Sequence, residues 1–343
     1  MELIISRKTV LWRTSLIPII FVILLVTEAH AEESPLKGLA GSPFTDATQI
    51  QEMSDSWKKQ SIKYDSSIDN ADLVVTFDQQ MYLAFLPIMQ QYAKENNLKI
   101  DINRGTCGLS AGELIRKSVD IGGFCCPPGT TDRLPGLQFH TTGIAAIALI
   151  VHPDNPIDNI TINQARKIFM GDIYLWTDIT AQDRLKKTHR LIQPVGRLHC
   201  KLRPGHWRLL LDNEDLFSPS LYEVGAIPDM LLQVAINPRA IGYEILWMAN
   251  YYQGNGKVKI LKINGYSPYE RSRVISTDYP LYRVYNLTTW EGKNLANPHA
   301  QKLIDYLIKQ SEHIEGKFSF IPVSRLRQAG WKFKGNELIG TPK

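Results

Sequence analysis

The chain has 343 residues, which is enough to bury a large core and is typical of two domains rather than one. Its composition is 44% hydrophobic and 21% charged, which is that of a globular protein and excludes a disordered or low-complexity chain. A formal net charge of +5 is spread along the chain without a block of Lys or Arg, so it does not indicate a nucleic-acid partner.

The first 31 residues have the pattern of a secretory signal peptide. It consists of three basic residues, an apolar run and an A-x-A triplet: Arg7, Lys8, Arg13, Leu16–Val26 and Ala29-His30-Ala31. The apolar run is shorter than the roughly 20 residues that a membrane-spanning helix needs. We therefore expect a periplasmic or otherwise exported protein. An uncleaved N-terminal anchor is the alternative, because Glu28 is unusual so close to a cleavage site.

Residues 32–71 are polar and without clear periodicity, so we expect an N-terminal extension that wraps the surface or is partly disordered. A strand at Asp72–Phe77, a helix at Gln80–Glu95 and a second strand at Leu98–Asn103 follow. Alternation of strands and helices predicts a parallel sheet with right-handed crossovers.

The predicted location of the ligand depends mainly on the stretch Arg104–Pro128. It gives a loop of small residues, a short helix opening near Ser110, and a buried strand Val119–Gly123 that ends on Cys125-Cys126. The free N–H groups and the dipole at a helix start favour an anion. Both loops follow strands of an open sheet, and the carboxyl ends of such strands meet at one crevice. We therefore expect the ligand there.

The middle of the chain repeats this geometry. Two β-rich runs, Leu137–Thr141 and Ile144–Val151, precede a helix Ile162–Phe169 that Thr161 caps. A strand at Ile192–Arg197 then leads into a helix at His206–Asn213. The remaining predicted elements are two helices and three strands: Asp229–Ala235, Ile241–Ile245, Lys257–Ile263, Tyr279–Thr289 and Asn297–Glu312.

Four segments in this order resemble the periplasmic phosphate-binding proteins of ABC importers. They are the opening strand and helix from Asp72, the glycine-rich loop with V-D-I-G ending at Gly122, the I-F-M-G-D-I-Y-L-W-T-D segment Ile168–Asp178, and the Y-P-L-x-R strand Tyr279–Arg283. The resemblance spans most of the chain after the signal segment.

The resemblance implies the type 2 periplasmic-binding fold, an α/β protein of two lobes. Each lobe would be a mostly parallel sheet flanked by helices, with the ligand cleft between them. We expect lobe 1 to comprise residues 72–142 and 277–343, and lobe 2 to comprise residues 143–276. Two crossing strands would join the lobes, which would close by hinge motion.

The resemblance also implies a ligand-binding set. Thr76 and Phe77 would contribute from the first strand, and Cys107, Gly108 and Ser110 from the anion loop. Cys125 stands where the family has an Asp that accepts a hydrogen bond from protonated phosphate. Arg197 matches the family's Arg, while His199 and Cys200 replace the residues that follow it. With His206, the predicted ligand-binding residues are Thr76, Phe77, Cys107, Gly108, Ser110, Cys125, Arg197, His199, Cys200 and His206.

The cysteines leave two interpretations open. Export favours a structural disulfide, with Cys107 bonded to Cys125 or Cys126. Thiolates and imidazoles together favour a soft metal ion instead. The alternative metal-ligand set is Cys107, Cys125, Cys126, Cys200, His199 and His206.

We therefore expect an exported solute-binding protein, not an enzyme, that binds a small oxyanion such as phosphate. Its partner would be an ABC permease or a membrane sensor. We expect no cofactor, no nucleic-acid partner, and contact with a membrane only through the signal segment. The alternative is a Cys/His metal-binding or thiol-redox sensor on the same fold.

Overall fold

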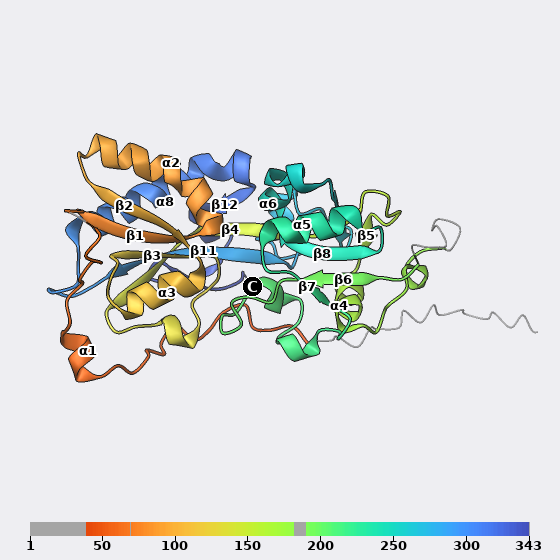
Figure 1. The fold of residues 1–343 in the computed structure, drawn as a ribbon, viewed down its shortest axis with the longest axis horizontal. Coiled ribbons are helices and arrows are strands. Elements are labelled where there is room, and N and C mark those ends of the chain that lie inside the picture. Colours follow the sequence, from red (N-terminus) through yellow and green to blue (C-terminus); the bar gives the residue numbers. More distant parts are fainter. Residues whose placement is uncertain (1–38, 69, 182–189, 343) are drawn as a thin grey trace, which may run out of the picture. The chain divides into compact units, whose positions relative to one another are not determined.

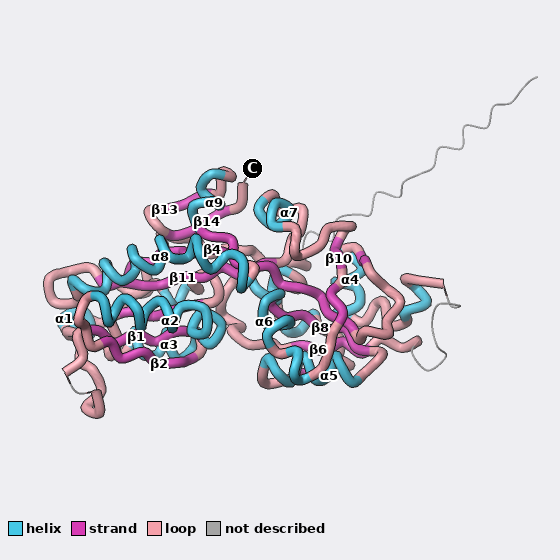
Figure 2. Tube along the Cα trace, turned by 90° about the horizontal axis from the view of Figure 1, so that it is seen from above, coloured by secondary structure: helices cyan, strands magenta, loops and turns pink. Residues whose placement is uncertain are grey.

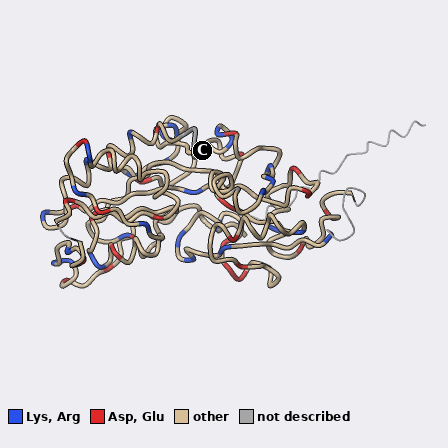
Figure 3. Tube along the Cα trace, turned by 45° about the horizontal axis from the view of Figure 1, so that its top comes forward, with Lys and Arg blue, Asp and Glu red and all other residues tan. Residues whose placement is uncertain are grey.

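The protein is described from a computed structural model covering residues 39–68, 70–181 and 190–342. The predicted signal peptide, residues 1–31, lies outside the described residues. Within them, no helix has both the length and the apolar character needed to cross a bilayer. Lys and Arg are interspersed with Asp and Glu along the described chain, as the sequence indicates (Figure 3).

A mixed sheet forms the centre of the molecule, with strand order β2-β1-β3-β11-β4-β8-β6-β7. The strands along this path are β1 (Leu73–Asp78), β2 (Ile100–Gly105), β3 (Ile121–Phe124), β4 (Leu137–Val151), β6 (Gln193–Gly196), β7 (Tyr222–Glu223), β8 (Ala240–Ile245) and β11 (Tyr282–Trp290). The short strands β9 (Lys259–Ile260) and β12 (Phe320–Pro322) belong to the same sheet and also pair with β4. Pairing is parallel at both ends and antiparallel in the middle, where β4 pairs with β11 and β8. The sheet is therefore parallel only within its two end portions.

Helices cover the sheet on both faces. Near β1, helices α2 (Gln79–Glu95) and α8 (Pro298–Phe318) pack together on one face, while α3 (Cys107–Ile115) covers the other (Figure 1). This arrangement follows from right-handed crossovers, since β2 and β3 flank β1 on opposite sides. Helix α5 (Ile227–Ile236) packs on β8 in the other portion of the sheet.

Shorter elements complete the fold, as the tube coloured by secondary structure shows (Figure 2). The short helices and turns are α1 (Asp55–Lys59), η1 (Thr130–Asp132), α4 (Ile162–Met170), η2 (Trp176–Asp178), η5 (His206–Leu209), η6 (Glu214–Leu216), α6 (Leu246–Tyr251), η7 (Gln253–Asn255), α7 (Arg271–Ile275) and α9 (Val323–Gln328). The short strands are β5 (Asn159–Ile160), β9 (Lys259–Ile260), β10 (Lys262–Ile263), β12 (Phe320–Pro322), β13 (Lys332–Lys334) and β14 (Glu337–Gly340).

Four predictions about the elements differ from the structure. The single strand predicted at Lys257–Ile263 is two short strands, β9 and β10, which belong to different sheets. Helix α3 begins at Cys107, three residues before Ser110, because the Thr106 side chain caps it by accepting from the N–H of Leu109. The two β-rich runs from Leu137 form one long strand, β4. The helix predicted at His206–Asn213 is only the 3-10 turn η5, so no α-helix starts at this loop.

The described part of the N-terminal extension packs against the rest of the chain. Trp57 is buried against Trp290, and its indole N–H donates to the carbonyl of Ile115. Farther upstream, the N–H of Gly41 donates to the carbonyl of Arg208. The extension thus contacts segments that are far apart in the sequence.

Candidate functional site

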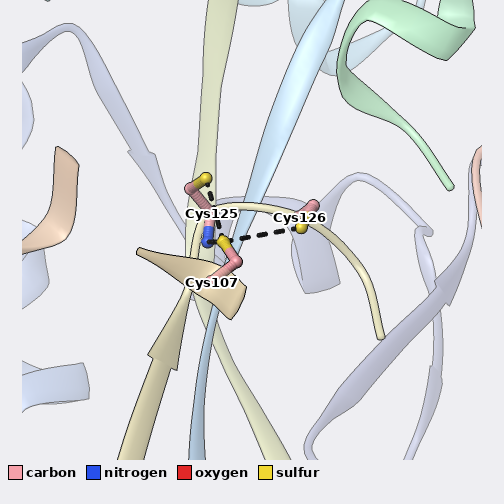
Figure 4. Close-up of side chains that lie close together, drawn as sticks. All are labelled: Cys107, Cys125 and Cys126. Carbon is pink, nitrogen blue, oxygen red and sulfur yellow. Dashed lines mark hydrogen bonds between the residues drawn. The ribbon is translucent and has the colours of Figure 1, made fainter. Parts of the chain in front are cut away.

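The first component of the site is a cluster of three buried thiols. Cys107 is the first residue of α3, whereas Cys125 and Cys126 directly follow β3. The Cys107 Sγ lies 3.2 Å from the Cys125 Sγ and 3.7 Å from the Cys126 Sγ (Figure 4). The backbone N–H of Cys125 also donates to the Cys107 Sγ at 3.2 Å. All four cysteines of the chain are free thiols, so the predicted disulfide is not present.

The second component is Arg283, on the long strand β11 beside the cluster. Its Nη1 lies 3.3 Å from the Cys125 Sγ, and its Nη2 lies 3.2 Å from the His199 Nε2. The side chain is buried, and its Nε has no hydrogen-bond partner among the residues that the structure describes. No carboxylate lies within 4.0 Å of this guanidinium in the described part of the chain. A buried cation without a carboxylate needs some other counter-ion.

The third component is the loop after β6, which brings His199 and Cys200 to the cluster. His199 accepts from Arg283 through Nε2, so its Nδ1–H donates to the carbonyl of Arg197 at 2.9 Å. Thiol hydrogen bonds with Cys107 and Cys126 lower the pKa of the Cys200 thiol well below its ordinary value. Cys200 adopts a positive φ of 57°, which is unusual for a residue other than glycine.

His206 stacks on His199 from the turn η5, with ring centroids 5.8 Å apart. Its Nε2 lies 3.1 Å from the carbonyl oxygen of Arg203, so this nitrogen carries the proton. The opposite nitrogen, Nδ1, is buried and has no hydrogen-bond partner within the described part of the chain. Burial lowers the pKa of His206 well below its ordinary value, and the ring is neutral.

Two other buried arginines near the cluster are already paired with carboxylates. Arg203 binds Asp132 through two hydrogen bonds of 2.6 and 2.8 Å. Arg197 contacts Glu244 at 3.4 Å, and no hydrogen-bond partner for its Nε lies in the described ranges. Arg283 is therefore the guanidinium of this site that lacks a carboxylate within the described residues.

The clustered thiols differ in the direction of their pKa shifts. Hydrogen bonds from Cys107 and Cys126, and then the charge of Arg283, lower the pKa of the Cys125 thiol well below its ordinary value. Burial raises the pKa of the Cys107 thiol well above its ordinary value. Burial raises the pKa of the Asp78 carboxyl, and the nearby Cys125 raises it further. This carboxyl lies 3.7 Å from the Cys107 Sγ.

Four predicted site residues make other contacts. The Thr76 hydroxyl donates to the Glu113 carboxylate, and Phe77 packs edge-on against Phe85 in the core. The Ser110 hydroxyl lies within 3.2 Å of the carbonyl oxygens of Thr76 and Gly123. Gly108 is exposed. Of the ten predicted residues, the structure brings five into one group around Arg283: Cys107, Cys125, His199, Cys200 and His206. Arg197 lies beside this group, because its carbonyl accepts from His199.

Sequence reasoning missed Arg283 and Asp78 as site residues. Arg283 is a charged residue inside the apolar strand L-Y-R-V-Y, and that break in the pattern is the signal that could have identified it. Asp78 caps α2, and its Oδ1 accepts from the N–H of Gln80. An N-cap is ordinarily a structural feature, so its nearness to Cys107 was not predictable from the sequence.

The strand order and the covering helices define a two-lobed periplasmic-binding-protein fold, and comparisons with known proteins agree. No family model matches the chain. The phosphate-binding protein PstS of Bacillus subtilis is 24% identical over 270 residues, which covers 75% of this chain and 83% of that protein.

Two solved structures share the fold. An ABC-type phosphate transport receptor from Vibrio cholerae has a TM-score of 0.57 at 15% identity, covering 73% of this chain and 99% of its own. A substrate-binding protein from Clostridium perfringens, solved with bound phosphate, has a TM-score of 0.59 at 18% identity, covering 73% and 98%. The resemblance to the periplasmic phosphate-binding family that the sequence predicts is thus confirmed.

Proposed function

We propose that the protein is an exported solute-binding protein that holds a small oxyanion, phosphate or a related ion, at Arg283. Its mature chain would deliver the ion to an ABC permease or present it to a membrane sensor, without chemical conversion. The proposed lobes are residues 72–142 with 277–343, and residues 143–276, after a signal peptide of residues 1–31 and an extension of residues 32–71.

One observation carries this proposal. Arg283 is only 2% exposed and has no carboxylate partner in the part of the chain that the structure describes. A planar guanidinium binds an oxyanion through two parallel N–H donors, and such charge-assisted bonds are strong. The unpartnered Nε groups of Arg283 and Arg197 are further donors that an anion would satisfy.

The phosphate-binding relative and the phosphate-bound structural neighbour support this ligand class. Cys125 departs from the family, since it stands where the resemblance implies a carboxylate. A thiolate or thiol lacks the two oxygens with which a carboxylate would accept a hydrogen bond from a protonated oxyanion. We therefore expect weak discrimination between phosphate and a fully ionised oxyanion such as sulfate. Because the donors are buried, entry of the ion requires the lobes to open.

Calorimetry with phosphate, sulfate, arsenate and molybdate tests the proposal. We expect one ion to bind per chain, with an affinity about 10- to 100-fold lower in Arg283→Met, because a hydrogen bond to a charged group contributes about 1.5–3 kcal/mol. Arg239→Met removes an exposed arginine instead and should bind normally. The absence of heat with all four ions would rule out oxyanion binding.

A further inference from the structure

The three buried sulfur atoms have the separations of ligands around one ion. The Sγ atoms of Cys107, Cys125 and Cys126 all lie within 4.8 Å of one another, and none is in a disulfide. Tetrahedral zinc with Zn–S bonds of about 2.3 Å requires sulfur atoms about 3.8 Å apart. The separation of 3.7 Å between Cys107 and Cys126 matches, whereas the 3.2 Å between Cys107 and Cys125 would widen slightly on binding.

The charge balance at the cluster also favours a metal cation that is bound by thiolates. Zn(II) held by three thiolates has a net charge of −1, and so has Cu(I) held by two. Arg283, 3.3 Å from the Cys125 Sγ and without a carboxylate among the described residues, would neutralise either complex. The buried site would then contain no net charge from the ion, its thiolates and this guanidinium.

We propose that Cys107, Cys125 and Cys126 bind one thiophilic d10 metal ion, Zn(II) or Cu(I), in the buried space beside Arg283. Thiolates are the ligands that both ions prefer. Binding forms metal–sulfur bonds and releases the remaining thiol protons to solvent, with no change of oxidation state. The inference does not rest on oxyanion binding. Because the metal–thiolate complex would occupy Arg283, a bound metal should weaken oxyanion binding.

The test is an anaerobic titration of the reduced protein in phosphate-free buffer, with Zn(II) and Cu(I) each competed against a chromophoric chelator. We expect one equivalent to bind. Cys107→Ser and Cys125→Ser should each lower the affinity by more than about 100-fold, since even second-shell partners cost 10- to 100-fold. Cys126→Ser separates the two ions, because zinc needs the third thiolate and Cu(I) does not. His313→Ala removes an exposed histidine from α8 and should change nothing.

A count of reactive thiols gives a readout independent of affinity, since bound metal should protect two or three of the four thiols from an aromatic disulfide reagent. Circular dichroism of each metal-free variant checks that it is folded. The proposal fails if neither ion binds, or if Cys107→Ser binds as tightly as the wild type. It also fails if protein isolated without reductant carries a Cys107–Cys125 disulfide, because those sulfurs would hold each other. Calorimetry with phosphate on metal-free protein tests the oxyanion separately.

Discussion

The two segments that form the site are built in different ways. The first, residues 105–132, carries its cysteines at the start of α3 and the end of β3, both anchored in the sheet. The second, residues 197–206, is a loop in which Cys200 and His206 both adopt positive φ angles of 57° and 45°. Such angles cost about 1–3 kcal/mol in residues other than glycine and persist only where the surroundings impose them. The loop is therefore held by its contacts with the first segment.

The contact with the largest expected effect is the buried pair of Asp132 and Arg203. Asp132→Ala leaves the Arg203 guanidinium buried without its partner, and we expect a loss of about 3–5 kcal/mol in the free energy of unfolding. Chemical denaturation measures this loss. The double variant Asp132→Leu with Arg203→Met should recover much of it, since it leaves no unpaired charge. A loss below about 1 kcal/mol in the single variant would show that the pair does not hold the loop.

Gly129 permits a close approach between the two segments. A Cβ at this position would lie 2.6 Å from the carbonyl oxygen of Leu202, which belongs to the backbone and cannot rotate away. We expect Gly129→Ala to lower the free energy of unfolding by about 1–3 kcal/mol, as overpacking does. Gly225→Ala is a matched control, because nothing lies within 4 Å of its Cβ. Equal stability of the two variants would contradict the close packing of the loop.

The first segment depends on its own helix cap. Thr106→Ala removes the side-chain oxygen that accepts from the N–H of Leu109, and we expect a loss of about 1 kcal/mol. Thr106→Ser keeps the oxygen and should retain most of the stability. Thermal unfolding of both variants measures the difference. If Thr106→Ala were as stable as the wild type, the start of α3 would be held by other contacts.

Substitution of Asp78 has the smallest expected effect on the free energy of unfolding at low pH. The effect should become larger as the pH rises. Burial, followed by the charge of Cys125, raises the pKa of Asp78, so its contribution to stability is complete below the unfolded-state pKa near 3.8 and is lost as pH rises through the folded value. Asp78→Asn keeps the acceptor for Gln80 and cannot ionise. Its stability relative to wild type should therefore increase as pH rises from 4 to 8. A relative stability that falls with pH would contradict a raised pKa.

The sequence predicted the regular parts well. Apolar spacing along α2 and the cap residue Thr161 placed these two helices within one residue of the structure, whereas α8 continues to Phe318, beyond the predicted end at Glu312. It predicted the second segment less well, because the helix expected from His206 is a short turn. Helical patterns describe local preference, whereas this loop is shaped by an ion pair with Asp132, 71 residues away. Arg283 interrupts an apolar strand, but only the folded sheet shows that its side chain is buried with no carboxylate partner among the described residues.

The most direct test of the account is the stabilisation that phosphate gives to the metal-free wild type and to Arg283→Met. At a phosphate concentration 100 times the dissociation constant, the wild type should gain about 2.7 kcal/mol in the free energy of unfolding. Arg283→Met should gain much less at the same concentration, and Arg239→Met should match the wild type. An equal gain in Arg283→Met would contradict the account, because the anion would then be held elsewhere.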